Sequence, residues 1–181
     1  MKNFLNLSKY ELIIMGLYII IFPLFFVFVP DVLRYNFSTE NLGQVFLIIL
    51  IASLVFYFLN IFFPFGKIGW QNLKFSQILL VFVYTILFAI PEEIIFRGII
   101  QGSIQNYIGD IFLAIVASSL IFGLAHLPNG SKSFHLKDWN WQFAIIAFLI
   151  GLPLCAIFAI TSSLLIPTLL HAFILIFLKL F

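Results

Sequence analysis

The sequence is poor in charge. Its 181 residues include only 9 Lys and Arg and 7 Asp and Glu, so 9% of the chain is charged. An ordinary soluble domain carries about 25% charged residues. A soluble domain of this size needs polar groups to cover its surface, and this chain has too few of them. The shortage excludes an ordinary soluble globule, a disordered chain and a protein that binds nucleic acid.

Cysteine is nearly absent as well. Cys155 is the single cysteine, so no internal disulfide can form and no cysteine pair has metal-binding spacing. Apolar side chains are abundant instead, since 64% of the residues are hydrophobic and 25 are phenylalanine. This composition predicts an integral membrane protein, with membrane lipid as a partner.

Long apolar runs divide the chain into about six segments that are long enough to cross a membrane as helices. None of them alternates between apolar and polar residues as barrel strands do, and no internal repeat suggests a transporter. We therefore expect an all-α fold, a polytopic membrane helix bundle. The six segments cover residues 12–29, 43–65, 77–104, 111–127, 141–160 and 164–181.

These segments fall into two groups. Residues 1–76 hold the first two helices and a connection at residues 68–76. The connection mixes Trp, Leu and Phe with Lys, so we expect it to lie flat on the inner membrane surface. Residues 77–181 hold the other four helices and are expected to form a four-helix core.

The basic residues orient the chain in the cell membrane. If the N-terminus is cytoplasmic, seven lysines fall in inside segments and only Arg34 falls in an outside segment. The positive-inside rule then predicts a multi-pass protein with both termini in the cytoplasm. The seven are Lys2, Lys9, Lys67, Lys74, Lys132, Lys137 and Lys179.

Three charged residues lie inside a predicted span. They are Glu92, Glu93 and Arg97, all in the third span. A buried ionisable group costs at least about 2.5–3.5 kcal/mol at the centre of a membrane helix, so three together need a reason. Glu93 and Arg97 are four residues apart and can pair on one helix face, whereas Glu92 points about 100° away and suits a general base. The alternative is a structural ion pair beside a Glu that faces a wet loop, but an ion pair does not need the second carboxylate.

Pro91 is expected to weaken the helix one turn upstream.

Two histidines also lie within spans. His126 is near the inner end of the fourth span, and His171 is midway along the sixth. A single membrane histidine is more often a hydrogen-bonding group between helices than a catalyst. Two of them in different spans, at depths that Glu92 can share, favour one polar cavity that opens toward the cytoplasm. The third histidine, His135, lies in a polar loop and is expected to be solvated.

The order and spacing of these residues are similar to those of a known family. Glu-Glu-x-x-x-Arg at residues 92–97, Phe-x-x-x-His at residues 122–126 and His171 in the last span resemble the CAAX-protease and bacteriocin-processing family of intramembrane proteases, also called the ABI family. The resemblance covers roughly residues 78–181, with the first two spans as a variable addition. It implies hydrolysis of a peptide bond in a membrane-associated or lipidated peptide or protein, close to the cytoplasmic face.

The resemblance also implies a role for each residue. Glu92 would activate the attacking water with help from His126, and His171 would help to stabilise the tetrahedral oxyanion. Glu93 and Arg97 would hold the site in shape. On the substrate side, Phe122 would wall the cavity one turn from His126, and Thr168 faces the same side as His171.

The family has been described both as metalloproteases and as glutamate proteases. Glu92, His126 and His171 are residue types that can bind zinc. The chain lacks the H-E-x-x-H motif, so we favour catalysis by glutamate without a metal cofactor and keep zinc as the alternative.

One position departs from the family pattern. The last motif usually carries Asn or Asp four residues after its His, and this chain has Leu175 there. Removing an oxyanion donor can lower a rate by about 10²–10³, unless Thr168 substitutes for it. The departure keeps open a family member that binds partners without cutting, such as a bacteriocin-immunity or regulatory membrane protein. A third class, a helix bundle that binds haem through His126 and His171, is disfavoured by their unequal depths.

Overall fold

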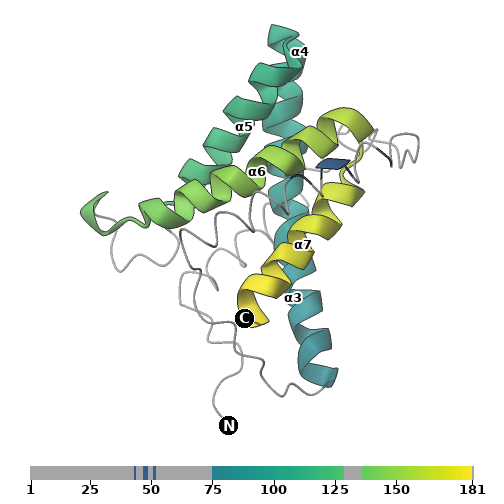
Figure 1. Cartoon of the computed structure of the whole chain (residues 1–181), viewed down its shortest axis with the longest axis vertical. Coiled ribbons are helices and arrows are strands. Elements are labelled where there is room, and N and C mark those ends of the chain that lie inside the picture. Colours follow the sequence, from purple (N-terminus) through teal and green to yellow (C-terminus); the bar gives the residue numbers. More distant parts are fainter. Residues whose placement is uncertain (1–42, 44–46, 49–50, 52–74, 129–135, 181) are drawn as a thin grey trace.

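The computed structural model describes residues 43, 47, 48, 51, 75–128 and 136–180 (Figure 1). The first expected span, all but four residues of the second and most of the expected interfacial connection lie outside the described residues. Within them the fold is all-helical, with no strand, as the sequence predicts. The elements are α3 (Phe75–Glu93), the π-helix η2 (Ile94–Gln101), α4 (Gly102–Ile108), α5 (Ile111–Ala125), the 3-10 turn η3 (Leu136–Asp138), α6 (Trp141–Thr161) and α7 (Leu165–Leu180).

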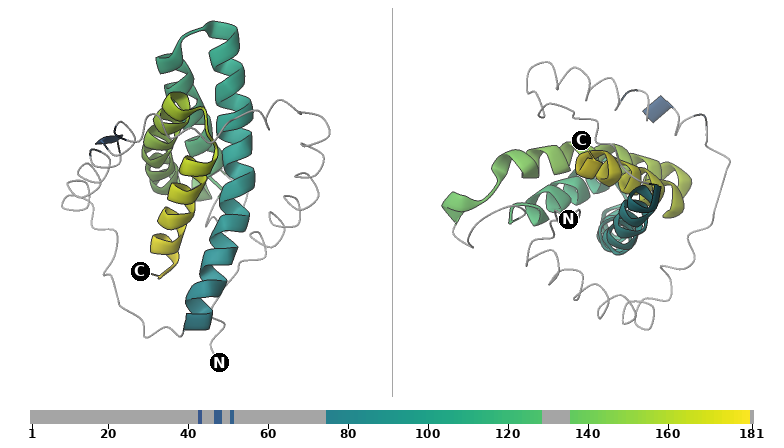
Figure 2. Two further views of the ribbon diagram at one scale, coloured as in Figure 1. Left: turned by 90° about the vertical axis from the view of Figure 1, so that its right-hand side faces the viewer. Right: turned by 90° about the horizontal axis from the view of Figure 1, so that it is seen from below.

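The third predicted span forms one continuous rod made of α3, η2 and α4 (Figure 2, left). It ends at Gly109, whose positive φ of 75° is a left-handed conformation that suits glycine. Asp110 then starts α5, because its side chain accepts hydrogen bonds from the backbone N–H groups of Phe112 (2.9 Å) and Leu113 (3.0 Å). The sequence predicts this cap at Asp110. The turn makes α4 and α5 an antiparallel hairpin.

Two glycines let α5 and α6 approach closely. A Cβ atom at Gly123 would lie 2.7 Å from the carbonyl oxygen of Ala144 and 2.8 Å from Cβ of Phe148. A Cβ atom at Gly151 would lie 3.3 Å from Cα of Ser119. Each helix therefore uses a glycine where it meets the other helix, as small residues do in membrane bundles.

The remaining helix, α7, runs beside α3 in both views (Figures 1 and 2). η2 contacts both α5 and α6 as well as its own continuations. The rod of α3, η2 and α4 therefore lies between α7 and the pair formed by α5 and α6. A side chain near the junction of α3 and η2 can reach α5 on one side and α7 on the other.

The described helices have apolar outer faces, and their apolar interior also holds a set of polar residues. Leu79 and Leu87 on α3, Phe112 on α5 and Phe173 on α7 are all more than half exposed. Ten polar or charged residues are buried within the apolar core. One helix among the described residues, Trp141–Thr161 with a mean hydropathy of 2.8, is long and apolar enough to cross a membrane, and Ile111–Ala125 and Leu165–Ile176 are shorter apolar helices.

Candidate active site

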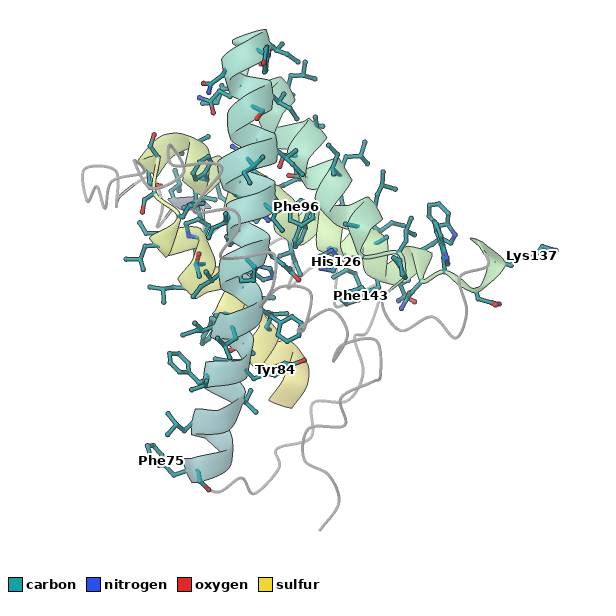
Figure 3. All side chains as sticks on the ribbon, turned by 180° about the vertical axis from the view of Figure 1, so that it is seen from behind. Phe75, Tyr84, Phe96, His126, Lys137 and Phe143 are labelled. Atoms are coloured by element: carbon teal, nitrogen blue, oxygen red, sulfur yellow. The ribbon has the colours of Figure 1, made fainter. Side chains whose placement is uncertain are left out.

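The five predicted catalytic residues come from four elements and meet in the interior. Glu92 and Glu93 end α3, Arg97 lies in η2, His126 caps the C-terminus of α5 and His171 lies in α7. Figure 3 shows His126 beside Phe143 of α6, among the helices and far from the exposed Lys137.

Glu93 is the centre of the buried part of this cluster. Its Oε2 atom lies 3.0 Å from Nε of Arg97, and both side chains are fully buried. Its Oε1 atom lies 2.7 Å from Nδ1 of His171. The i, i+4 spacing predicts the contact with Arg97, whereas the contact with His171 joins residues 78 apart in the sequence and no local pattern signals it.

Glu92 faces the two histidines. Its Oε2 atom lies 3.7 Å from Nε2 of His126 and 3.7 Å from Nε2 of His171. Both distances are too long for a direct hydrogen bond and are compatible with a water molecule that contacts all three atoms. The Glu92 side chain is 12% exposed, whereas that of Glu93 is fully buried. Of the two carboxylates, Glu92 is therefore the one that a reactant can reach.

Hydrogen bonds assign the proton on each imidazole. Nδ1 of His126 lies 2.8 Å from the carbonyl oxygen of Phe122. A carbonyl only accepts, so Nδ1 of His126 carries the proton and donates it. Nδ1 of His171 likewise donates to the Glu93 carboxylate. In each neutral ring Nε2 then presents its lone pair, and both lone pairs belong to the atoms nearest to Glu92.

The helix around the site departs from the expectation for Pro91. The sequence predicts weakening one turn before the proline, but α3 continues as an α-helix through Glu93 with Pro91 inside it. The irregularity lies after the proline, as the π-helix η2. The α-helix tolerates Pro91, which is buried against its neighbours. A π-helix is rare and is found frequently at functional sites, and here it carries Arg97.

The two residues expected on the substrate side are both enclosed. Phe122 is 1% exposed, so its ring does not line an open surface. Thr168 is 9% exposed, and its hydroxyl donates to the carbonyl oxygen of Leu164 at 2.6 Å. The Thr168 hydroxyl would have to rotate before it could donate to an oxyanion. Leu175 is half-buried and has no polar group to offer.

Two further buried polar residues, Gln101 and Ser118, join η2 to its neighbours and were not predicted as site residues. Nε2 of Gln101 donates to the carbonyl oxygen of Cys155 at 2.9 Å, which ties η2 to α6. Oγ of Ser118 donates to the carbonyl oxygen of Phe96 at 2.7 Å, which ties η2 to α5. Gln101 lies four residues after Arg97, so its polarity on the same face of an apolar span was the available signal. Cys155 is fully buried.

Among the residues that the structure describes, no group of three or more His, Cys, Asp or Glu side chains has an arrangement suited to a metal ion. His135 lies outside the described residues.

Ionisable groups enclosed by helices with apolar outer faces are typical of membrane proteins with a functional site in their interior. One protein family, described as type II CAAX prenyl endopeptidase Rce1-like, matches residues 72–177, which is more than half of the chain. The protein belongs to this Rce1-like family of membrane proteases, and the match confirms the resemblance seen in the sequence. No curated protein and no solved structure matches the chain.

Proposed function

We propose that this protein is an intramembrane endopeptidase in which Glu92 activates water to cut a membrane-associated or prenylated peptide near the cytoplasmic face. One observation carries the proposal. The Glu92 carboxylate lies at equal distances of 3.7 Å from the Nε2 atoms of His126 and His171, so all three can act on one water or one reacting carbonyl.

The first step is attack by water on the scissile carbonyl carbon. Glu92 accepts one proton of the water, and Nε2 of His126 accepts a hydrogen bond from the other, so the water oxygen keeps a lone pair for attack. A C–O bond forms, and the carbonyl oxygen becomes an oxyanion. When His171 carries a second proton, its Nε2–H can donate to that oxyanion.

The second step breaks the C–N bond. Glu92 transfers the proton that it received to the leaving amine, so one water has been added across the peptide bond and Glu92 is restored. His171 then again points its Nε2 atom toward the carboxylate of Glu92. No external oxidant or reductant is needed.

The Glu93–Arg97 pair supports this chemistry through charge. With both carboxylates ionised, Arg97 cationic and the two imidazoles neutral, the five groups carry one net negative charge. A second proton on His171 would bring the total to zero. Glu93 contacts Nδ1 of His171 directly, so its carboxylate lies beside the ring that donates to the oxyanion.

The same proposal includes the membrane arrangement. We infer six membrane helices with both termini cytoplasmic, residues 77–181 as the catalytic core and residues 1–76 as an N-terminal addition. The Lys bias of the loops supports this orientation. His126 lies at the end of α5 that is continued by the Lys-bearing segment 128–137, so the site would lie nearest to the cytoplasmic surface.

Cleavage of defined peptides in vesicles tests the proposal. The purified protein is reconstituted and given a prenylated peptide that ends in a CAAX sequence, with the same peptide lacking the prenyl group as the control. We expect release of the C-terminal fragment from the prenylated peptide, and no loss of activity with a chelator. Loss of activity with a chelator and recovery with Zn²⁺ would replace the glutamate mechanism by a metal one. A complete lack of cleavage would favour a family member that binds partners without cutting, the alternative suggested by Leu175 at the position of the usual oxyanion donor.

A further inference from the structure

The ring of Phe122 contacts three of the ionisable residues of the site. Its ring centroid lies 4.4 Å from Cζ of Arg97, 4.4 Å from the ring of His126 and 5.6 Å from the ring of His171. With an exposure of 1%, the ring lies inside the protein and not on a surface that a substrate contacts.

The backbone of Phe122 sets the state of His126. Its carbonyl oxygen accepts the hydrogen bond from Nδ1 of His126 at 2.8 Å. The imidazole therefore turns its Nε2 atom toward Glu92, and the 4.4 Å ring contact restricts the imidazole further. This part of the arrangement is local, because the two residues are one helical turn apart.

The face of the Phe122 ring acts on a different residue. Arg97 is fully buried, and among the described residues neither of its Nη atoms has a hydrogen-bond partner. The Phe122 ring lies against the guanidinium group, and the negative face of an aromatic ring attracts a cation. The Arg97 side chain is thus held between the Phe122 ring and the Glu93 carboxylate.

The neighbours of Phe122 fix the ring in this place. The ring of Phe96 meets it edge to face at 4.9 Å and an angle of 84°. On the side of α6, a Cβ atom at Gly151 would lie 3.3 Å from Cδ1 of Phe122, so α6 leaves no room for the ring to move away. Because the ring cannot move, it restricts the positions of the side chains that it contacts.

We propose that Phe122 is a positioning residue that couples the Glu93–Arg97 ion pair to both histidines of the reaction centre. This inference rests on the proposed function for its effect on turnover. On one side the ring fixes Arg97, which fixes Glu93 and through it Nδ1 of His171. On the other side it fixes His126. Both Nε2 atoms then face Glu92 because one apolar side chain holds the two imidazoles in place.

Stepwise fluorination of the ring tests the role of its negative face. Phenylalanine with one, two or three ring fluorines is incorporated at position 122, which weakens the attraction for Arg97 and changes the size little. We expect kcat to fall with each fluorine, up to about 2–30-fold in total, with KM unchanged. The matched control is the same series at Phe173, which is 66% exposed on α7 and should leave both constants unchanged. A constant kcat across the series at position 122 would mean that the ring only fills space, and a change confined to KM would mean that it contacts substrate.

A second measurement does not need activity. In a His135→Gln background, ¹⁵N-labelled histidine reports only His126 and His171. We expect the ring-nitrogen signals of both to move in Phe122→Leu and to stay fixed in Phe173→Leu. Signals that coincide with those of the parent in Phe122→Leu would overturn the positioning role. If the signals move but the parent cleaves no peptide, the positioning role stands and the proposed protease function fails.

Discussion

At the residue scale, the ion pair between Glu93 and Arg97 is the contact on which the buried cluster depends most. Replacing Arg97 with Ala leaves the Glu93 carboxylate buried without its cation, which typically destabilises a protein by about 3–5 kcal/mol. We expect Arg97→Ala to lower the yield of folded protein as well as activity. Detergent-induced unfolding followed by circular dichroism measures the effect, with the exposed Lys137→Ala as the control. An Arg97→Ala protein as stable as the parent would show that Glu93 does not rely on Arg97.

Position 175 tests whether an oxyanion donor limits turnover. Leu175 lies one turn after His171 and is half-buried. An Asn at this position would offer an N–H to the oxyanion, so we expect Leu175→Asn to raise kcat, by up to about 10²–10³ if that donor alone is limiting. The control is Leu175→Met, which keeps the side chain apolar. If Leu175→Asn gives no gain, another group already serves this purpose.

The sequence singled out the five ionisable residues, but of their contacts it predicted only the Glu93–Arg97 pair. The i, i+4 rule gives the Glu93–Arg97 pair, since both residues lie on one helix. The bond between Glu93 and His171 depends on how α7 packs on α3, which no local pattern encodes. The carbonyl of Phe122 as partner of His126 is likewise a consequence of where α5 ends.

At the scale of elements, the crossing of α5 and α6 is expected to be sensitive to small changes in volume. A methyl group at position 123 would meet the backbone of Ala144 at 2.7 Å, and backbone cannot rotate away. We expect Gly123→Ala to destabilise the protein by about 1–3 kcal/mol, the usual cost of overpacking. The free energy of unfolding in detergent mixtures measures it. Ala125→Val, which adds methyl groups at an exposed position of α5, should change little, and equal stability of Gly123→Ala and the parent would contradict the close crossing.

The helices themselves were easier to predict than their irregularities. The expected segments 111–127, 141–160 and 164–181 agree within about two residues with α5, α6 and α7. Apolar runs with clear interruptions at Gly109, Asn140 and Ser162 account for this agreement. The π-helix after Pro91 was not predicted, because a proline indicates where a helix is strained but not how the surrounding helices accommodate it.

At the scale of the whole molecule, the proposed orientation predicts which ends of the helices face the cytoplasm. In a Cys155→Ser background, a cysteine at Lys132 should react with an impermeant thiol reagent only after the cytoplasmic side is opened. A cysteine at Tyr107, which is 91% exposed near the α4–α5 turn, should react from outside intact cells. Labelling of the Lys132 site from outside would reverse the orientation and place the site on the opposite face.

Composition settles the class of the molecule more firmly than its details. A shortage of charge and an excess of apolar residues are properties of the whole chain, and the family match over residues 72–177 agrees with them. The number of spans, in contrast, depends on residues 1–74, of which the structure describes only four positions. The six-span arrangement therefore stays a prediction.

The most direct measurement compares Glu92→Gln with the parent protein on a prenylated CAAX peptide in vesicles. Gln keeps the size and hydrogen bonding of the side chain but cannot take the proton of the water. Our account predicts that cleavage falls by a factor of about 10²–10⁴ while the amount of folded protein stays the same, the range expected for loss of a general base. Cleavage by Glu92→Gln at the rate of the parent would contradict the account, because the reaction would then proceed without Glu92 as its base.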